Sequence, residues 1–428
     1  MPDLLYAYYG DDFTGSTDVL ESLAEGGVAG VLLLREPTRT LLARFPGVRA
    51  VGMAGDSRSR SPEWMDRHLP HAFAALGALG PRIVHYKTCS TFDSSPGTGS
   101  IGRAMEIGAR MCGGPVPILV GAPHLGRYVV FANLYADAGG TTYRIDRHPT
   151  MAHHPVTPMR EADLRRHLAD QTDMPVGHIP LDAIQAGATE ARFASEVEHG
   201  AGAILFDGVA ARDLLASGRA VLARDDVRFA VGSSGVTRAL LAAWEADGMV
   251  QGPTELPRAG SVERLLVISG SCSPVTAAQI GWAEAKGWTM LRVDPASCDE
   301  AAVAAQAAAA LGEGRSTVLY SANGPLSEGE RAGGAQLGVR LGRITRSIRA
   351  QVAVPRILFA GGDTSSHAVA ELGLDALTWR APLAPGAPLC RAHGGSDEAP
   401  LELVLKGGQM GGEDFFESVR SGAGPAAR

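Results

Sequence analysis

Short apolar runs recur along the chain, and each is followed by a turn of small polar residues and then by a segment with helical spacing. The first example is LLYAYYG (4–10), followed by DDFTGSTDVLESLAEGG (11–27) and by the apolar run VAGVLLL (28–34). An apolar run of this length predicts a buried strand, and the longer amphipathic segment predicts a helix. Strands that alternate with helices in this way predict largely parallel sheets with helices on both faces, so we expect an α/β fold.

The alternation continues to the end of the sequence, with one break. Further strands are predicted at 48–53, 82–86, 116–121, 202–207, 228–232, 264–270, 289–294, 316–321, 356–360 and 401–405, and an alanine-rich helix at 300–311. The stretch 245–262 is rich in proline and glycine and has weak periodicity, so we expect a linker at 249–261. This boundary predicts two α/β domains, residues 1–248 and 262–428, with an active-site cleft between them.

Composition narrows the possible partners. The 428 residues carry a formal charge of −7, which gives no positive field to attract nucleic acid or an anionic membrane. Without a signal-like leader or an apolar stretch of membrane-spanning length, we expect a cytoplasmic protein, with a homodimer as the prior for its assembly. Five cysteines without CxxC spacing favour reduced thiols. Only Lys87, Lys286 and Lys406 are lysines, so a lysine at a strand end suggests a role that arginine cannot fill.

Three strands of the second half are followed by turns of small residues: SGSCSPVT (269–276), AGGDTSSHAVAEL (360–372) and KGGQMGGEDFF (406–416). Free backbone N–H groups in such turns, at helix N-termini, favour an anion, and glycine allows the anion to approach closely. Three turns at one edge of a sheet would form a polyphosphate cradle. Each turn alone is also explained by an ordinary cap, such as Ser273 before Pro274, or by Thr364, Ser365 or Ser366. The sequence contains no GxxxxGK[ST] motif, and no GxGxxG follows a strand.

In the first half, the segment GDDFTGSTD (10–18) joins the first strand to the first helix, at the edge where open α/β sheets bind ligands. Asp18, with Glu21 three residues later, resembles a capping box and predicts a structural role for Asp18. Asp11 and Asp12 have no such local role. One of them is expected to accept a proton from a substrate hydroxyl, while the other orients a group or holds Mg²⁺.

Lys87 follows an apolar strand and precedes a turn rich in hydroxyl groups, with Ser90 and Thr91. This combination is suited to a carboxylate or a polyol, although Lys87 is also explained as a solvated strand end. Further along, Thr157 and Pro158, with acidic residues soon after, predict a helix cap. His148, His153 and His154 lie in a proline-bearing loop without the spacing of metal ligands, so no metal cluster is expected there. Ser233 and Ser234 are expected to cap another helix.

Several of these motifs occur together, in a fixed order. They are GDDFTGSTD (10–18), YKTCST (86–91), HPVTPMREADL (154–164), GSCSPVTAAQI (270–280), GGDTSSHAVAELG (361–373) and KGGQMGGEDFF (406–416). On these motifs, and over nearly its whole length, the chain resembles the four-carbon acid sugar kinase family. That family, formerly a domain of unknown function, includes D-threonate, D-erythronate and 3-oxo-tetronate kinases.

The resemblance implies that the first domain binds the acid sugar and that the second binds ATP, with Mg²⁺ on its phosphates. The expected acid-sugar contacts are Asp11, Asp12, Thr14, Gly15, Lys87, Ser90 and Thr91. The expected nucleotide contacts are Ser271, Gly361, Gly362, Asp363, Thr364 and Gly408. We expect an ATP-dependent phosphorylation of a hydroxyl group, with Asp12 as the proton acceptor and Asp11 as the second candidate.

The chain departs from the family pattern in one turn. Where the family usually reads DSTLRGN, this sequence reads CSTFDSS, so Cys89 replaces an aspartate and Asp93–Ser95 replace Arg-Gly-Asn. A branched or keto acid such as 3-oxo-isoapionate is therefore an option beside the linear acids. Two other interpretations stay open: a non-catalytic sugar-acid sensor on the same scaffold, and a dehydrogenase, although the glycine fingerprint of the latter is missing.

Overall fold

The computed structural model describes residues 4–154, 156–294, 297–324, 334–394 and 400–424. By its internal contacts the chain forms two compact units. The first unit contains residues 1–31 and 36–253, and the second contains residues 32–35 and 254–428. The predicted linker at 249–261 includes the point where the chain passes from one unit to the other. The sequence pattern did not predict that residues 32–35 belong to the second unit.

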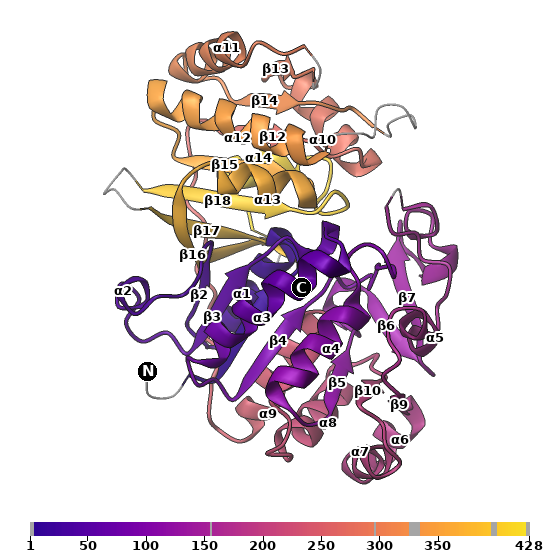
Figure 1. The fold of residues 1–428 in the computed structure, drawn as a ribbon. Coiled ribbons are helices and arrows are strands. Elements are labelled where there is room, and N and C mark those ends of the chain that lie inside the picture. Colours follow the sequence, from indigo (N-terminus) through magenta and orange to yellow (C-terminus); the bar gives the residue numbers. More distant parts are fainter. Residues whose placement is uncertain (1–3, 155, 295–296, 325–333, 395–399, 425–428) are drawn as a thin grey trace. The chain divides into compact units, whose positions relative to one another are not determined.

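The first unit is built on a parallel sheet with the strand order β3-β1-β4-β11-β5-β10-β9 (Figure 1). Its strands are β1 (Tyr6–Gly10), β3 (Ala50–Ala54), β4 (Ile83–Lys87), β5 (Val116–Leu119), β9 (Val176–Ile179), β10 (Ala203–Phe206) and β11 (Phe229–Gly232). Every residue of β1, β4, β5, β10 and β11 is buried. This burial on both faces explains why the strands read as continuous apolar runs.

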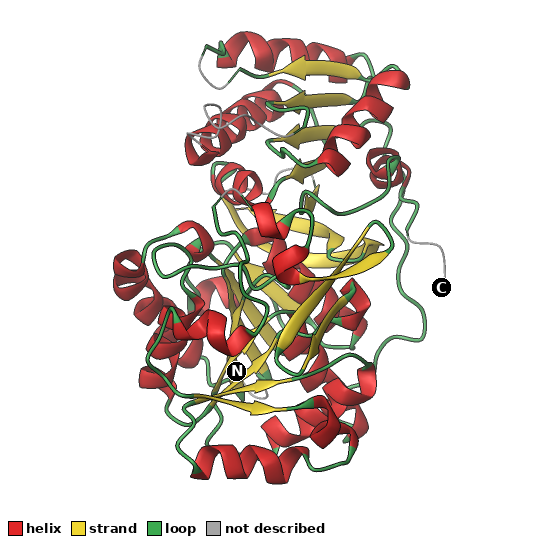
Figure 2. Ribbon diagram, turned by 90° about the vertical axis from the view of Figure 1, so that its right-hand side faces the viewer, coloured by secondary structure: helices red, strands yellow, loops and turns green. Residues whose placement is uncertain are grey.

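Helices cover this sheet on two faces. On one face α1 (Phe13–Glu25) contacts α9 (Ser234–Ala246), and α9 contacts α8 (Ala211–Leu222). Elsewhere α3 (Pro62–Gly77) packs on α4 (Ile101–Cys112). The shorter helices are α2 (Arg39–Leu42), α5 (Leu164–Ala169), α6 (Leu181–Gln185) and α7 (Thr189–Glu198). Figure 2 shows helices on both sides of the strands, which confirms the predicted α/β architecture.

A small antiparallel sheet in the first unit was not predicted. It contains β6 (Arg127–Val130), β7 (Asn133–Ala138) and β8 (Thr141–Arg144). These strands are only partly buried and carry mixed polar residues, so they lack the apolar runs that marked the parallel strands.

The second unit has a parallel sheet in the order β13-β14-β12-β15-β18, continued by the antiparallel strands β17 and β16. Its strands are β12 (Leu266–Ser269), β13 (Thr289–Arg292), β14 (Thr317–Tyr320), β15 (Arg356–Ala360), β16 (Leu374–Ala384), β17 (Ala387–Gly394) and β18 (Leu401–Lys406). Its helices are α10 (Pro274–Ala285), α11 (Glu300–Gly312), α12 (Gly334–Gln351), α13 (Gly362–Ala370) and α14 (Phe415–Ser421).

The antiparallel pair of β16 and β17 also escaped the sequence prediction, because its register is irregular at three places and its polar positions do not alternate strictly. In this unit Leu32 and Leu33 of β2 (Gly30–Leu33) pair with Leu377 and Ala376 of β16. Among the described residues, no helix combines the length and the apolar character that a membrane crossing requires.

Candidate functional site

The first group of candidate residues lies where β1 and β4 end side by side. Gly10 of β1 stands opposite Lys87 of β4, and the Asp11 backbone N–H donates to the Lys87 carbonyl oxygen at 2.9 Å. The turn after β1 and the turn after β4 therefore start at the same level of the sheet. The sequence placed both turns at strand ends, and the strand order brings them together.

Asp12 is the N-cap of α1, and both of its carboxylate oxygens accept hydrogen bonds. Oδ1 accepts from the Gly15 backbone N–H at 2.5 Å, and Oδ2 accepts from Arg58 Nη1 at 3.0 Å. The prediction that Asp18 caps this helix is therefore wrong. The helix begins directly after the strand, at Phe13, so Asp18 falls inside it, where a side chain cannot reach the free N–H groups of the first turn.

Asp18 instead forms a buried ion pair with Lys87, whose Nζ lies 3.5 Å from Asp18 Oδ2. Lys87 is 2% exposed and also donates to the Thr88 carbonyl oxygen at 3.0 Å, which argues against a solvated strand end. Gly15 leaves the room that this arrangement needs, because a Cβ there would lie 2.7 Å from Asp12 Oδ1 and 3.0 Å from Lys87 Nζ. Neighbouring Thr14 is buried, and its hydroxyl has no hydrogen-bond partner among the described residues.

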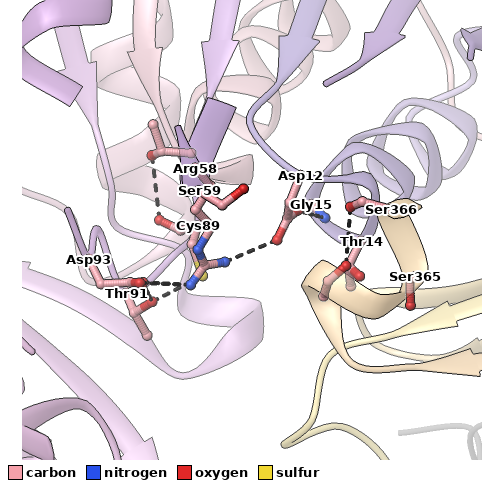
Figure 3. Close-up of polar contacts among 12 residues, drawn as sticks. Asp12, Thr14, Gly15, Arg58, Ser59, Cys89, Thr91, Asp93, Ser365 and Ser366 are labelled. Atoms are coloured by element: carbon pink, nitrogen blue, oxygen red, sulfur yellow. Dashed lines mark hydrogen bonds and ion pairs between the residues drawn. The ribbon is translucent and has the colours of Figure 1, made fainter. Parts of the chain in front are cut away.

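Arg58 links the two turns, and the sequence pattern did not single it out. It lies in a short 3-10 helix, η1 (Ser57–Ser59), after β3. Its Nη2 donates to both oxygens of Asp93 at 2.8 Å, while its Nη1 donates to Asp12 (Figure 3). The sequence contains only a weak indication of Arg58. Two turns with buried carboxylates at one sheet edge require a nearby cation, but the sequence does not show which of the many arginines supplies it.

Asp93 is enclosed by donors. Besides Arg58 it accepts hydrogen bonds from Thr91 Oγ1 at 2.5 Å and from Thr157 Oγ1 at 2.8 Å. Burial by itself would raise the pKa of Asp93, but the charges of Arg58 and His154, together with the hydrogen bonds from Thr91 and Arg58, outweigh burial and hold this pKa well below its usual range. Asp93 is therefore a carboxylate at any physiological pH. Ser90, which precedes Thr91, is half-buried.

Asp11 differs from its neighbour Asp12. It is buried, and its Oδ1 has no hydrogen-bond partner in the part of the chain that is described. Burial, followed by repulsion from Asp12, raises the pKa of Asp11 to about 7, and the charges of Arg58 and Lys87 offset only part of this rise. Of the two aspartates, Asp11 is the one with a buried carboxylate oxygen that accepts no hydrogen bond among the described residues.

The loop before α5 also contributes to this group, in a role that was not predicted. Thr157 does not cap a helix: α5 begins at Leu164, and its N-cap is Asp163. Thr157 lies in the turn before this helix, and its hydroxyl donates a hydrogen bond to Asp93 instead. His148 Nδ1 and His154 Nδ1 each accept a backbone N–H of the loop, and His154 Nδ1 also lies 4.0 Å from Asp93 Oδ2. Within the described ranges, no group of three or more His, Cys, Asp or Glu residues could hold a metal ion.

In the second unit, β12, β15 and β18 are neighbours, and their carboxyl ends are level. Ser269 stands opposite Ala360, and Ala360 stands opposite Lys406. The three small-residue turns therefore begin side by side. Ser273 is the N-cap of α10, as predicted. In the first unit, Ser233 is the N-cap of α9, which was also predicted. The third turn keeps its glycines outside any helix, because α14 begins only at Phe415.

The predicted nucleotide residues pack together in these turns. Gly361 has a φ of 111° and is the N-cap of α13, so Gly362 is the first helical residue and Ser365 and Ser366 are not caps. A Cβ on Gly361 would lie 3.3 Å from the Ser271 nitrogen, and a Cβ on Gly408 would lie 3.0 Å from Ser271 Oγ. The side chains of Asp363 and Thr364 lie outside the described residues. Because Gly361 and Gly408 lack a Cβ, these turns pack closely together and a ligand can approach their backbone.

Lys406, at the end of β18, was not among the predicted site residues, although the scarcity of lysine drew attention to it. Its side chain is fully buried, and Nζ donates to Thr276 Oγ1 at 2.9 Å. Thr276 in turn donates to the Gly408 carbonyl oxygen at 3.0 Å. Burial lowers the pKa of Lys406 to about 7, and no charged side chain of the described residues contributes to this shift. Gln279 anchors the same turn by donating to the carbonyl oxygens of residues 410–412.

Comparisons with known families match both parts of the chain. A sugar-binding N-terminal domain matches residues 6–240, and a nucleotide-binding C-terminal domain matches residues 266–416. A 3-oxo-isoapionate kinase of Paraburkholderia graminis is 46% identical over an alignment that covers 98% of this chain and 94% of that protein. A 3-oxo-tetronate kinase of Methylobacterium radiotolerans is 32% identical, with 95% of this chain and 96% of that protein covered.

A solved structure extends the similarity to three dimensions. The crystal structure of a Salmonella typhimurium LT2 protein, described as a tRNA synthase, superposes with a TM-score of 0.76 at 25% identity. The superposition covers 97% of this chain and 98% of the other. The fold is therefore shared from end to end.

Proposed function

The chain belongs to the four-carbon acid sugar kinase family, and from this premise we propose that it transfers the γ-phosphoryl group of ATP to a hydroxyl group of a small sugar acid. The structural observation that carries the proposal is the level ending of three parallel strands in turns that pack Ser271, Gly361 and Gly408 together. Such turns suit the phosphates of a nucleotide, because their N–H groups point toward an anion and glycine lets it approach.

The first substrate to test is a branched five-carbon oxo acid, 3-oxo-isoapionate. The relative of that name is 46% identical to this chain, whereas the 3-oxo-tetronate kinases of Methylobacterium radiotolerans and Pseudomonas fluorescens are each 32% identical. Linear four-carbon acids such as 3-oxo-tetronate, threonate and erythronate come next. Lys87, Ser90, Thr91 and the turn from Asp11 to Gly15 are proposed to hold the acid.

For the chemical step, a substrate hydroxyl oxygen attacks the γ-phosphorus, and the bond from this phosphorus to the bridging oxygen breaks to release ADP. The hydroxyl proton passes to a carboxylate. The contacts favour Asp11 over Asp12 as this acceptor, which reverses the order expected from the sequence. Asp12 already accepts hydrogen bonds on both oxygens, while Asp11 Oδ1 has none and its pKa lies near 7, a suitable value for a general base.

On the nucleotide side, we propose that Ser271, Gly361, Gly362, Asp363, Thr364 and Gly408 line the phosphates. Lys406 would add a positive charge that no described acid compensates. Mg²⁺ would arrive on the ATP phosphates and neutralise part of their charge, since this ion is usually held by phosphates and one or two carboxylates. A cleft between the two domains, a homodimer and a cytoplasmic location all stay predictions.

The test is a measurement of ADP release with Mg²⁺, ATP and a panel of tetronates, oxo-tetronates and 3-oxo-isoapionate. We expect ADP formation that depends on the acid, and the highest kcat/KM with 3-oxo-isoapionate. If the folded protein releases no acid-dependent ADP with any four- or five-carbon acid, the proposal is wrong. If only a linear acid is phosphorylated, the kinase proposal stands and the branched substrate is rejected.

A further inference from the structure

Arg58 is held between two carboxylates that come from different parts of the chain. One nitrogen of its guanidinium, Nη2, faces both oxygens of Asp93, and the other, Nη1, faces Asp12 (Figure 3). A guanidinium presents paired donors that match a carboxylate, and in a site for sugar acids such donors would be available to the substrate. Here Asp93 occupies Nη2, and Asp12 occupies Nη1.

Asp93 is itself fixed from three directions. Arg58 contacts it from η1, Thr91 from its own turn, and Thr157 from a loop 64 residues further along the chain. Its side chain is completely buried, so these donors replace water. The carboxylate cannot turn away from Arg58 without breaking several hydrogen bonds at once.

The contacts continue beyond Arg58 to the start of α1. Asp12 Oδ2 accepts from Arg58, and Asp12 Oδ1 accepts from the Gly15 N–H. Among the described residues, Arg58 is the side chain that contacts both Asp93 and Asp12, and Asp12 is the immediate neighbour of Asp11. A shift of Arg58 would therefore move Asp12 through their hydrogen bond, and Asp11 through the backbone that joins it to Asp12.

We propose that Asp93 is a positioning residue of the phosphoryl transfer: its carboxylate takes the place of a substrate carboxylate on Arg58 and directs the remaining guanidinium donor to Asp12. This inference rests on the proposed function of the site. It implies that Arg58 does not bind the carboxylate of the sugar acid, and that the part of the substrate next to Arg58 is uncharged.

The test is chemical rescue. Asp93→Ala removes the carboxylate and leaves a space next to Arg58. We expect kcat/KM to fall by roughly 100-fold, because misplacement of a group at a reacting centre has an effect of that size. We expect the loss to appear mainly in kcat, and added sodium formate to restore kcat in a saturable way, because formate supplies the missing carboxylate. Absence of rescue in a folded Asp93→Ala variant would overturn the proposal.

Two control variants separate this role from a general effect on packing. Asp93→Asn fills the space without a charge, so its loss of kcat should not respond to formate. Asp66→Ala removes the acid of another two-pronged pair, in which Arg103 Nε and Nη2 donate to Asp66 on the exposed surface. That variant should keep wild-type kinetics with and without formate. Equal formate responses in all three variants would contradict the assignment.

A measurement without turnover keeps the inference separate from the kinase proposal. Formate should raise the Tm of Asp93→Ala, but not that of Asp93→Asn or the wild type, whether or not a sugar acid is found. A Tm of Asp93→Ala that is independent of formate would overturn the proposal at any level of activity. If Asp93→Ala does not fold, Arg58→Lys replaces it: we expect that variant to fold and to lose kcat, because one ammonium cannot serve both carboxylates, and wild-type kcat would overturn the proposal.

Discussion

The two candidate sites lie at the carboxyl ends of parallel strands in their own units, yet they are built from different groups. The site of the first unit consists of charged side chains that compensate one another: Asp12 and Asp93 with Arg58, and Asp18 with Lys87. The turns of the second unit consist of glycine, serine and backbone N–H groups, with Lys406 as a buried cation that no described acid compensates.

This difference indicates where specificity resides. Backbone N–H groups recognise any phosphate, so a site made from them suits a ligand that many enzymes share. Charged side chains held in one geometry distinguish small acids that differ by one hydroxyl or one branch, because a buried group left unpaired by the wrong substrate costs binding energy. Changes in the first unit should therefore affect catalysis and substrate choice, and changes in the second should affect nucleotide affinity.

The largest effect is expected from Asp11→Asn. If Asp11 accepts the proton, kcat should fall by roughly 100- to 10,000-fold, the usual contribution of a general base. ADP affinity, followed by thermal shift, should not change, since the substitution lies in the first unit. A decrease in kcat of only a few-fold would exclude Asp11 from this role and return Asp12 to first place.

The pH dependence of the same pair of proteins gives an independent check. The pKa of Asp11 is raised from 3.8 to about 7, so kcat/KM of the wild type should rise with pH up to about 7 and then level off. The contribution of Asp11 to the free energy of unfolding should change with pH in the opposite direction, falling where kcat/KM rises. A carboxyl group with a raised pKa stabilises the folded state at low pH, and this contribution is lost as the pH rises from about 4 to about 7. In Asp11→Asn this loss of stability should be absent. Urea unfolding of both proteins at several pH values would measure the free energy of unfolding and check this.

The second largest effect concerns the buried cation of the second unit. Lys406→Met should weaken ADP binding by about 10- to 100-fold, the range for one hydrogen bond to a charged group, and leave sugar-acid binding unchanged. Lys286→Met is the matched control, because Lys286 is an exposed lysine of the same unit that lies over the Trp282 ring. Equal ADP affinities of the two variants would remove Lys406 from the nucleotide site.

Proton uptake distinguishes a charge effect of Lys406 from a packing effect. Since burial lowers its pKa to about 7, an anion bound nearby should raise that pKa and draw a proton from solution at pH values above 7. Calorimetry of ADP binding in buffers with different ionisation enthalpies should detect this uptake in the wild type and not in Lys406→Met. The free protein should also gain stability as the pH rises from 7 toward 10.5, because a lysine with a lowered pKa destabilises the folded state while it is protonated.

The contrast between the sites also explains how far the sequence could be interpreted. The candidate nucleotide turns could be located in the sequence because their signals are local: a strand, a glycine and a cap occur within ten residues, as at Gly361. These turns lie side by side because neighbouring parallel strands have their carboxyl ends at the same edge of the sheet. Lys406 could be suspected from its rarity, but its burial depends on how α10 packs on the turn, which no local pattern reports.

The charged site was predicted only in part, because its contacts join distant segments. Asp11, Asp12 and Lys87 were found at strand ends. Arg58, which donates to Asp12, and Thr157, which donates to Asp93, come from a 3-10 turn and a loop without a pattern of their own. The cap of α1 was misassigned to Asp18 since the capping pattern at 18 and 21 outweighed an earlier start that only the tertiary structure fixes. Long-range ion pairs are chosen by topology, and spacing in the sequence carries little information about them.

A smaller effect should test the backbone character of the nucleotide turns. In Gly408→Ala the new Cβ would lie 2.9 Å from the Ser273 Cβ, so the turn must shift, whereas in Gly407→Ala the nearest atom, the Met410 Sδ, lies at an ordinary 3.7 Å. We expect KM for ATP to rise roughly tenfold in Gly408→Ala, as for a typical overpacked site, and to stay unchanged in Gly407→Ala. Similar KM values in these neighbouring variants would argue against close packing as the basis of this site.

The smallest effect concerns the outermost support of the charged site. Thr157→Val removes one of the donors to Asp93, a hydrogen bond of 2.8 Å, and leaves Arg58 and Thr91 in place. Because one hydrogen bond contributes about 1 kcal/mol, kcat should fall by about fivefold. The matched control is Thr142→Val, which removes an exposed threonine that donates to the half-buried Asp137 and should leave kcat unchanged. If Thr157→Val instead altered the KM for ATP and spared kcat, the division of labour between a charged catalytic site and a backbone nucleotide site would be wrong.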